Sequence, residues 1–214
     1  ASAQYFAYPV TNPFSITSGY TNGIQSVNLI DIDNDGDLDL FTDSLTYGWY
    51  SYGINFNFQE NIGTPTNPNF KIPELNPFNL SLIPNDTSII NLRHFVDLDD
   101  DGDFDVLSNV LYQGYSQGYY SFMSKYRYYE NTGTPSTPNF ASAVTNPFGL
   151  QDSPNKIEFS AIGDIDNDGD FDLINSSLDY SSGQITFFNF IENTGTNLNP
   201  IFTTPQTNNF GLPA

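Results

Sequence analysis

The chain has 214 residues, which is enough for one domain with a substantial core and marginal for two. Its 19 Phe and 14 Tyr are typical of a folded, β-rich protein and not of a disordered chain. Twenty-five acidic residues against five basic ones give a net charge of −20. Because no basic stripe is present to meet phosphates, nucleic acid is excluded as a partner.

No stretch approaches the roughly 18 consecutive apolar residues of a membrane-spanning helix, so we expect no membrane insertion. Cysteine is absent, and no disulfide can stabilise the fold. The sequence begins at Ala1 without a Met, which is consistent with a mature protein whose export signal has been removed. We therefore expect an extracellular location, either secreted or at the cell surface.

The first repeat unit spans residues 12–75 and opens with the Asn-x-Phe phrase "NPFSI". The short apolar run "VNLI" precedes the acidic phrase "DIDNDGDLD" (31–39), and the aromatic segment "YGWYSYGINFNFQE" that comes later is typical of a strand. The Glu-Asn phrase "ENIGTPTNPNF" follows, and we expect its Gly63 to take a positive φ in a turn. Asn61, and with it Glu60, is expected to satisfy backbone donors around that turn.

The second unit spans 76–145, the third spans 146–207, and 208–214 begins a further partial unit. Both complete units carry the same three phrases, with Gly133 and Gly195 in the places of Gly63. The second unit is longer between its acidic and Glu-Asn phrases, which predicts a longer hairpin near "YQGYSQGYY". Turn residues are frequent and no sustained helical period is present, so we predict an all-β chain with roughly four short strands per unit.

Each acidic phrase places carboxylates at positions 1, 3, 5, 7 and 9 with a glycine at position 6. Calcium takes six to eight oxygen ligands, and a glycine lets one loop bend around the ion. We expect side-chain oxygens from positions 1, 3 and 5, a backbone carbonyl from position 7, and both carboxylate oxygens from position 9. The predicted ligands are Asp31, Asp33, Asp35, Asp37, Asp39, Asp97, Asp99, Asp101, Asp103, Asp105, Asp164, Asp166, Asp168, Asp170 and Asp172.

The apolar residues at positions 2 and 8 of each phrase are expected to anchor the loop to a core. An EF-hand is the competing interpretation, but position 12 is Thr42, Ser108 or Asn175 in place of Glu, and strands are expected in place of helices. Zinc would need His or Cys, and the chain has a single His, His94, which we interpret as structural. Magnesium fits less well, because it prefers few protein ligands in a strict octahedron.

The acidic phrase between short strands, followed by an aromatic strand and "ENTGTPSTPNF", resembles the FG-GAP/VCBS-type repeats of integrin α-subunit propellers and bacterial surface proteins. The resemblance covers nearly the whole chain. It implies one propeller-blade-like, four-stranded antiparallel sheet per unit with one calcium ion in an inter-strand loop, three ions in all. Three units are fewer than the roughly four to eight blades of closed propellers. We therefore expect an open row, or a scaffold that neighbouring subunits complete.

The matching character of the two chain ends favours head-to-tail self-association, which forms filaments when it does not close. The leading hypothesis is a secreted, calcium-stabilised structural protein that self-associates, for example as an extracellular filament subunit. The alternative is a cell-surface adhesion module that binds a glycan or a surface protein through aromatic residues near 112–129 or 49–52. We do not expect an enzyme, because the acidic groups recur in every unit and form no singular constellation.

Overall fold

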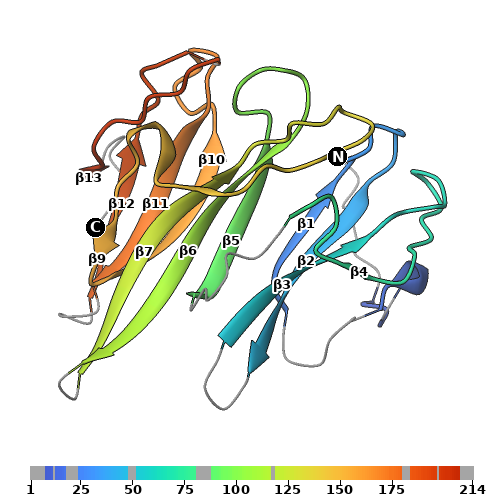
Figure 1. The fold of residues 1–214 in the computed structure, drawn as a ribbon, viewed down its shortest axis with the longest axis horizontal. Coiled ribbons are helices and arrows are strands. Elements are labelled where there is room, and N and C mark those ends of the chain that lie inside the picture. The colour runs from blue at the N-terminus through green and yellow to red at the C-terminus, as the bar shows by residue number, and fades with distance from the viewer. Residues whose placement is uncertain are drawn as a thin grey trace.

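The computed structural model describes residues 8–11, 13–17, 24–47, 52–80, 88–116, 119–179, 184–196 and 198–207. These residues form an all-β structure of three antiparallel sheets, none of which closes on itself. Figure 1 shows the three sheets in a row, with the second between the other two. Among the described residues, no helix has the length and apolar character needed to cross a bilayer.

The three sheets share one connectivity, in which strands follow each other in chain order across the sheet. The first sheet consists of β1 (Ile24–Ile30), β2 (Asp39–Tyr47), β3 (Tyr52–Gln59) and β4 (Glu74–Leu75). The second consists of β5 (Ser88–Val96), β6 (Asp105–Ser116), β7 (Tyr119–Tyr129) and β8 (Val144–Thr145), with β9 (Ser153–Pro154) also paired to β7. The third consists of β10 (Lys156–Gly163), β11 (Asp172–Asp179), β12 (Gln184–Ile191) and β13 (Gln206–Thr207).

Strand lengths confirm the longer hairpin predicted for the second unit. β6 and β7 have 12 and 11 residues, whereas β2 and β3 have nine and eight. The three extra pairs run from Gly114 opposite Ser121 to Ser116 opposite Tyr119, so the insertion extends an existing ladder.

The core lies between the sheets, because successive side chains of a strand point to opposite faces. One cluster fills the junction between the first and second sheets and contains Ile30, Ile32, Phe41, Phe56, Phe58, Leu80, Val106, Tyr129 and Phe140. Another fills the junction between the second and third sheets and contains Val96, Leu98, Leu107, Tyr126, Tyr128, Leu150, Leu173, Ile191 and Phe202. At both junctions, aromatic side chains of one sheet are therefore buried against the next sheet.

The Asn-x-Phe phrases form tight turns that bridge successive sheets. Phe78 packs on Phe58 of the first sheet with ring centroids 4.9 Å apart, and its carbonyl accepts a hydrogen bond from the N–H of Phe140 in the second unit. Phe148 repeats this arrangement between Tyr128 and Phe202. The turns are thus part of the junctions and not surface connections.

Candidate metal centres

Each acidic loop joins the first two strands of its sheet. The strands end in the pairs Ile30 opposite Asp39, Val96 opposite Asp105, and Gly163 opposite Asp172, so position 9 already belongs to the second strand. Strands flank all three loops, as the sequence predicts, and this excludes the helix-loop-helix of an EF-hand at these sites.

The structure brings together the carboxylates of positions 1, 3 and 5 in all three loops. One oxygen from each of the three side chains lies within 4.8 Å of the others, which is close enough for a single cation to contact all of them. The three groups are Asp31, Asp33 and Asp35; Asp97, Asp99 and Asp101; and Asp164, Asp166 and Asp168. The predicted ligands at positions 7 and 9 lie outside these groups.

Backbone geometry curls the loop around this acidic group. In the first loop, Asp31 accepts hydrogen bonds from the N–H groups of Asp35 and Gly36 at 3.0 and 3.1 Å. Gly36 has a φ of 95°, a conformation that side chains with a Cβ rarely adopt, and a Cβ there would meet nothing within 4 Å. The predicted role of the position-6 glycine is therefore confirmed, and it comes from φ and not from lack of space.

The side chain at position 7 is a buried hydrogen-bond acceptor. The sequence predicted a ligand role only for the backbone carbonyl of this residue. Asp37 is only 7% exposed, and no described donor lies within hydrogen-bonding distance of its Oδ1 atom. Asp103 and Asp170 are buried in the same way, each with an unpartnered Oδ1. A buried carboxylate oxygen without a donor is unfavourable, so each loop contains an oxygen atom that a donor or a cation would stabilise.

Position 9 ties the acidic loop to the Glu-Asn phrase. Oδ1 of Asp39 accepts a hydrogen bond from the N–H of Asn61 at 2.8 Å, and Asp105 and Asp172 accept equivalent bonds from Asn131 and Asn193. This long-range bridge explains why the two phrases occur together in every unit. Sequence reasoning assigned position 9 only a ligand role, although the constant pairing of the phrases is a signal for the contact.

Several carboxyl groups of the acidic loops have raised pKa values, because they are buried beside other carboxylates. Burial raises the pKa of Asp39 and of Asp105 to about 7. Burial and then the neighbouring carboxylates raise the pKa of Asp103 and of Asp170 to about 6. A cation within the loop would favour the ionised forms and reverse these shifts.

The apolar residues of the phrase behave differently at its two positions. At position 2, Ile32 and Leu98 are buried in the sheet junctions, which confirms the predicted anchor for these two residues. At position 8, Leu38, Phe104 and Phe171 are exposed, so the expectation that they anchor the loop is wrong. The reason is the two-residue period of a strand, because position 9 points inward and position 8 therefore points out.

The Asn side chain of the Glu-Asn phrase organises its turn, as predicted. Oδ1 of Asn61 accepts from the N–H groups of Gly63 and Asn69 at 3.0 and 2.9 Å, and Asn131 and Asn193 do the same in their units. The neighbouring acid has another role in the first unit, where the Glu60 carboxylate pairs with Lys71 at 2.6 Å.

The predicted positive φ at Gly63, Gly133 and Gly195 is wrong. None of the three takes a positive φ, but a Cβ on Gly63 would lie 2.4 Å from the carbonyl oxygen of Asn67. The glycine is required because the returning backbone passes against it, and the contacts at the other two glycines are equally close.

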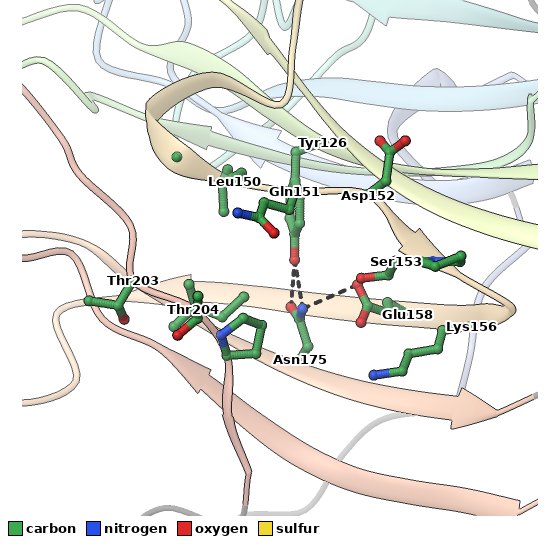
Figure 2. A pocket seen from close by; sticks show the side chains of 14 residues that line it. Tyr126, Leu150, Gln151, Asp152, Ser153, Lys156, Glu158, Asn175, Thr203 and Thr204 are labelled. Atoms are coloured by element: carbon green, nitrogen blue, oxygen red, sulfur yellow. Dashed lines mark hydrogen bonds between the residues drawn. The ribbon is translucent and has the colours of Figure 1, made fainter.

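A second feature is a cavity of about 340 Å³ beside the junction of the second and third sheets. In Figure 2, the hydroxyl of Tyr126 points toward Asn175, which in turn faces Glu158. These side chains bond mainly to one another, and burial raises the pKa of Glu158.

His94 lies at the same junction, 3.2 Å from the hydroxyl of Ser160, consistent with a structural role.

The aromatic residues proposed to bind glycans are divided among the core, half-buried positions and side chains that the structure does not describe. Tyr112 and Phe122 are half-buried and line a hollow on the second hairpin. Tyr126, Tyr128 and Tyr129 are buried in the two junctions and are not available as a stacking platform. Trp49 and the side chain of Tyr52 lie outside the described residues.

Comparisons with protein-family models, with curated proteins and with solved structures found no match.

Proposed function

We propose that this chain is a secreted, calcium-stabilised structural protein, built of tandem propeller-blade-like sheets, that self-associates into an extracellular filament. The observation that carries the proposal is the threefold recurrence of one oxygen-rich loop, in which three converging carboxylates lie beside the buried, unpartnered oxygen of position 7.

The donor set favours calcium over other common cations. Each loop offers only oxygen atoms, and calcium accepts six to eight of them in flexible geometry, whereas zinc selects nitrogen and sulfur. Positions 1, 3 and 5 would hold the ion, with further oxygens from positions 7 and 9. A carboxylate oxygen that accepts one backbone hydrogen bond keeps a lone pair, so position 9 can both bridge the phrases and contact the ion.

Calcium would act as a folding ligand and not as a switch. Three ions would offset six of the twenty net negative charges and would hold together loops whose carboxylates otherwise repel. A ligand that binds only the folded state stabilises it in proportion to the logarithm of its concentration. Extracellular calcium modules bind on the order of 10⁻⁴–10⁻³ M, a range suited to external fluids.

The test is thermal unfolding of the full chain in calcium and in excess chelator, together with a matched pair of variants. Asp99→Asn removes a converging carboxylate, whereas Asp100→Asn makes the same charge change at an exposed neighbour outside the group. We expect chelator to lower the melting temperature of the wild type substantially. Asp99→Asn should reduce calcium stoichiometry in titration calorimetry from three to two, and Asp100→Asn should retain three.

An unchanged melting temperature in chelator, or equal titrations for the two variants, would contradict the calcium assignment. Light scattering and electron microscopy in millimolar calcium test the assembly. Particles that stay monodisperse monomers would contradict the filament.

A further inference from the structure

The three sheets present equivalent faces that differ in how they are covered. The residue four positions before the Glu of each Glu-Asn phrase is Phe56, Tyr126 or Phe188. Phe56 and Tyr126 are 0% and 2% exposed because the following sheet covers them, whereas Phe188 is 41% exposed. Within the described part of the chain, the third sheet therefore carries an exposed copy of a surface that is buried in the other two sheets.

Strand register shows that this uncovered surface faces away from the second sheet. Asn175 of β11 points toward the second sheet, where it bonds Tyr126, so its neighbour Ser176 lies on the opposite face. Ser176 pairs with both Phe159 and Phe188, and both Phe side chains are exposed. The outer face of the third sheet thus carries two exposed aromatic side chains, on β10 and β12, with Ser176 of β11 between them.

The outer face of the first sheet is exposed where the equivalent faces of the second and third sheets contact a preceding sheet. Val27 occupies the position of Arg93 in the second sheet and Ser160 in the third, counted from the acidic phrases. Arg93 and Ser160 contact the preceding sheet through Asp43 and His94, respectively. Among the described residues no sheet precedes that of Val27, and its side chain is 62% exposed.

The first Asn-x-Phe turn shows the same half-made junction. The carbonyl oxygen of Phe14 accepts a hydrogen bond from the N–H of Phe70 at 3.0 Å. The carbonyl oxygens of Phe78 and Phe148 accept equivalent bonds in their junctions. Phe78 and Phe148 also pack on aromatic rings of the preceding sheet, whereas Phe14 is 53% exposed.

An apolar hollow of about 320 Å³ lies beside this turn on the outer face of the first sheet. Phe14, Ile16, Leu29, Leu38, Pro68 and Phe70 contribute to its lining. Exposed aromatics at one end of the row of sheets and an apolar hollow at the other are the two halves of a sheet-to-sheet contact.

We propose that the outer face of the third sheet, around Phe159 and Phe188, packs head-to-tail on the outer face of the first sheet of a second copy, around Phe14 and Val27. This deepens the proposed function by naming the surfaces of self-association, and it rests on that function. The contact repeats between copies the stacking that joins sheets within one copy. A heterologous contact of this kind leaves a free face at each end, so it propagates without closing unless its rotation forms a ring.

The experiment uses the full chain in millimolar calcium, with particle mass measured by analytical ultracentrifugation. Phe188→Glu disables one half of the contact, and Val27→Glu disables the other half. Ile72→Glu is the matched control, since it introduces the same charge at another strongly exposed apolar residue. We expect the wild type and Ile72→Glu to form long assemblies, and each of the other two variants to stay monomeric alone.

Mixing the two disabled variants gives the sharpest result. Phe188→Glu keeps an intact first-sheet face and Val27→Glu keeps an intact third-sheet face, so an equimolar mixture should form particles of two chains and no larger. Assembly by either variant alone, or no pairing in the mixture, would overturn the proposal. A chain that ends at Thr207 lacks the last Asn-x-Phe phrase. It should still assemble, because the Asn-x-Phe turn at residues 13–16 of the second copy would lie in the contact. Loss of its assembly would also overturn the proposal.

Failure of this contact is distinguishable from failure of the calcium scaffold. The calcium-dependent rise in melting temperature is measured for every variant and should match that of the wild type. If that rise is retained while the disabled variants still assemble, the proposed function stands and the contact is refuted. If the wild type assembles without any calcium-dependent rise, the calcium scaffold fails instead.

Discussion

The two sheet junctions have similar apolar frames but different polar centres. At the first junction, Arg93 of β5 pairs with Asp43 of β2, and its guanidinium carbon lies 3.3 Å from the ring centroid of Phe56. At the second junction, Tyr126 stands in the place of Phe56, and its hydroxyl belongs to a hydrogen-bonded network with Asn175 and Glu158. One scaffold thus accommodates a buried ion pair at one junction and a network of hydroxyl, amide and carboxyl groups at the other.

This difference shows how each junction tolerates change. Removing one member of a buried ion pair is strongly destabilising, because the other member is left as an uncompensated buried charge. A network of several hydrogen-bonding groups can lose one hydroxyl at the cost of about one hydrogen bond. The second junction also lies beside the cavity, where a displaced group has room to move. We therefore expect the first junction to be the more sensitive.

The largest effect is expected for Arg93→Met. This substitution leaves Asp43 buried without its partner and should lower the free energy of unfolding by about 3–5 kcal/mol, measured by urea denaturation in saturating calcium. The double variant Arg93→Met with Asp43→Leu removes both charges and should recover most of the loss. As a control, Lys125→Ala breaks the partly exposed pair with Asp152 and should change stability by less than about 1 kcal/mol. Equal losses for Arg93→Met and Lys125→Ala would show that the buried pair is not special.

A smaller effect is expected for Tyr126→Phe at the second junction. The ring stays and only the hydroxyl is removed, so the loss should be about 1 kcal/mol in the same assay. A loss as large as that of Arg93→Met would contradict the proposed difference between the junctions.

The smallest effect is a pH dependence at the second junction, which is expected from the titration of Glu158. Burial raises the pKa of Glu158 above its ordinary value of 4.5, partly offset by hydrogen bonds from Ser153 and Ser177 and by Lys156. The folded state then binds the proton more tightly than the unfolded state. The stability contributed by Glu158 is therefore fully present below pH 4.5 and is lost as the pH rises through the raised value.

The measurement is the stability of the wild type relative to Glu158→Gln across this pH range in saturating calcium. The variant keeps a hydrogen-bonding side chain but has no titrating group, so the wild type should lose stability relative to it as the pH rises. A constant difference would show that Glu158 does not couple to folding.

Local features of the sequence were sufficient to predict the acidic loops. The alternation of Asp with a glycine at position 6 predicted a bent loop between strands, and Gly36 has the required φ. The interpretation succeeded because such a bend depends on residues within a few positions of each other. The longer hairpin of β6 and β7 was predictable for the same reason, since an insertion between paired strands extends their ladder.

Contacts between distant segments were not predictable in this way. One local feature was also missed, because the glycine at position 63 was assigned to a positive φ, whereas the backbone of Asn67, four residues later, returns against it. Position 9 was recognised as acidic, but its hydrogen bond to the N–H of Asn61 crosses a whole hairpin. Leu38 was expected to be buried from its hydrophobicity alone, although the inward direction of Asp39 forces it outward.

The sequence by itself determined the number of units, the β class and the position of the three acidic loops, because repeated phrases and turn chemistry act over short stretches of chain. Only the tertiary structure decided that position 9 bridges to the Glu-Asn phrase, which oxygens remain unpartnered, and which faces stay uncovered. These properties depend on strand register and on stacking between sheets, and both join residues some twenty to seventy positions apart, as in the bonds of Asp39 with Asn61 and of His94 with Ser160.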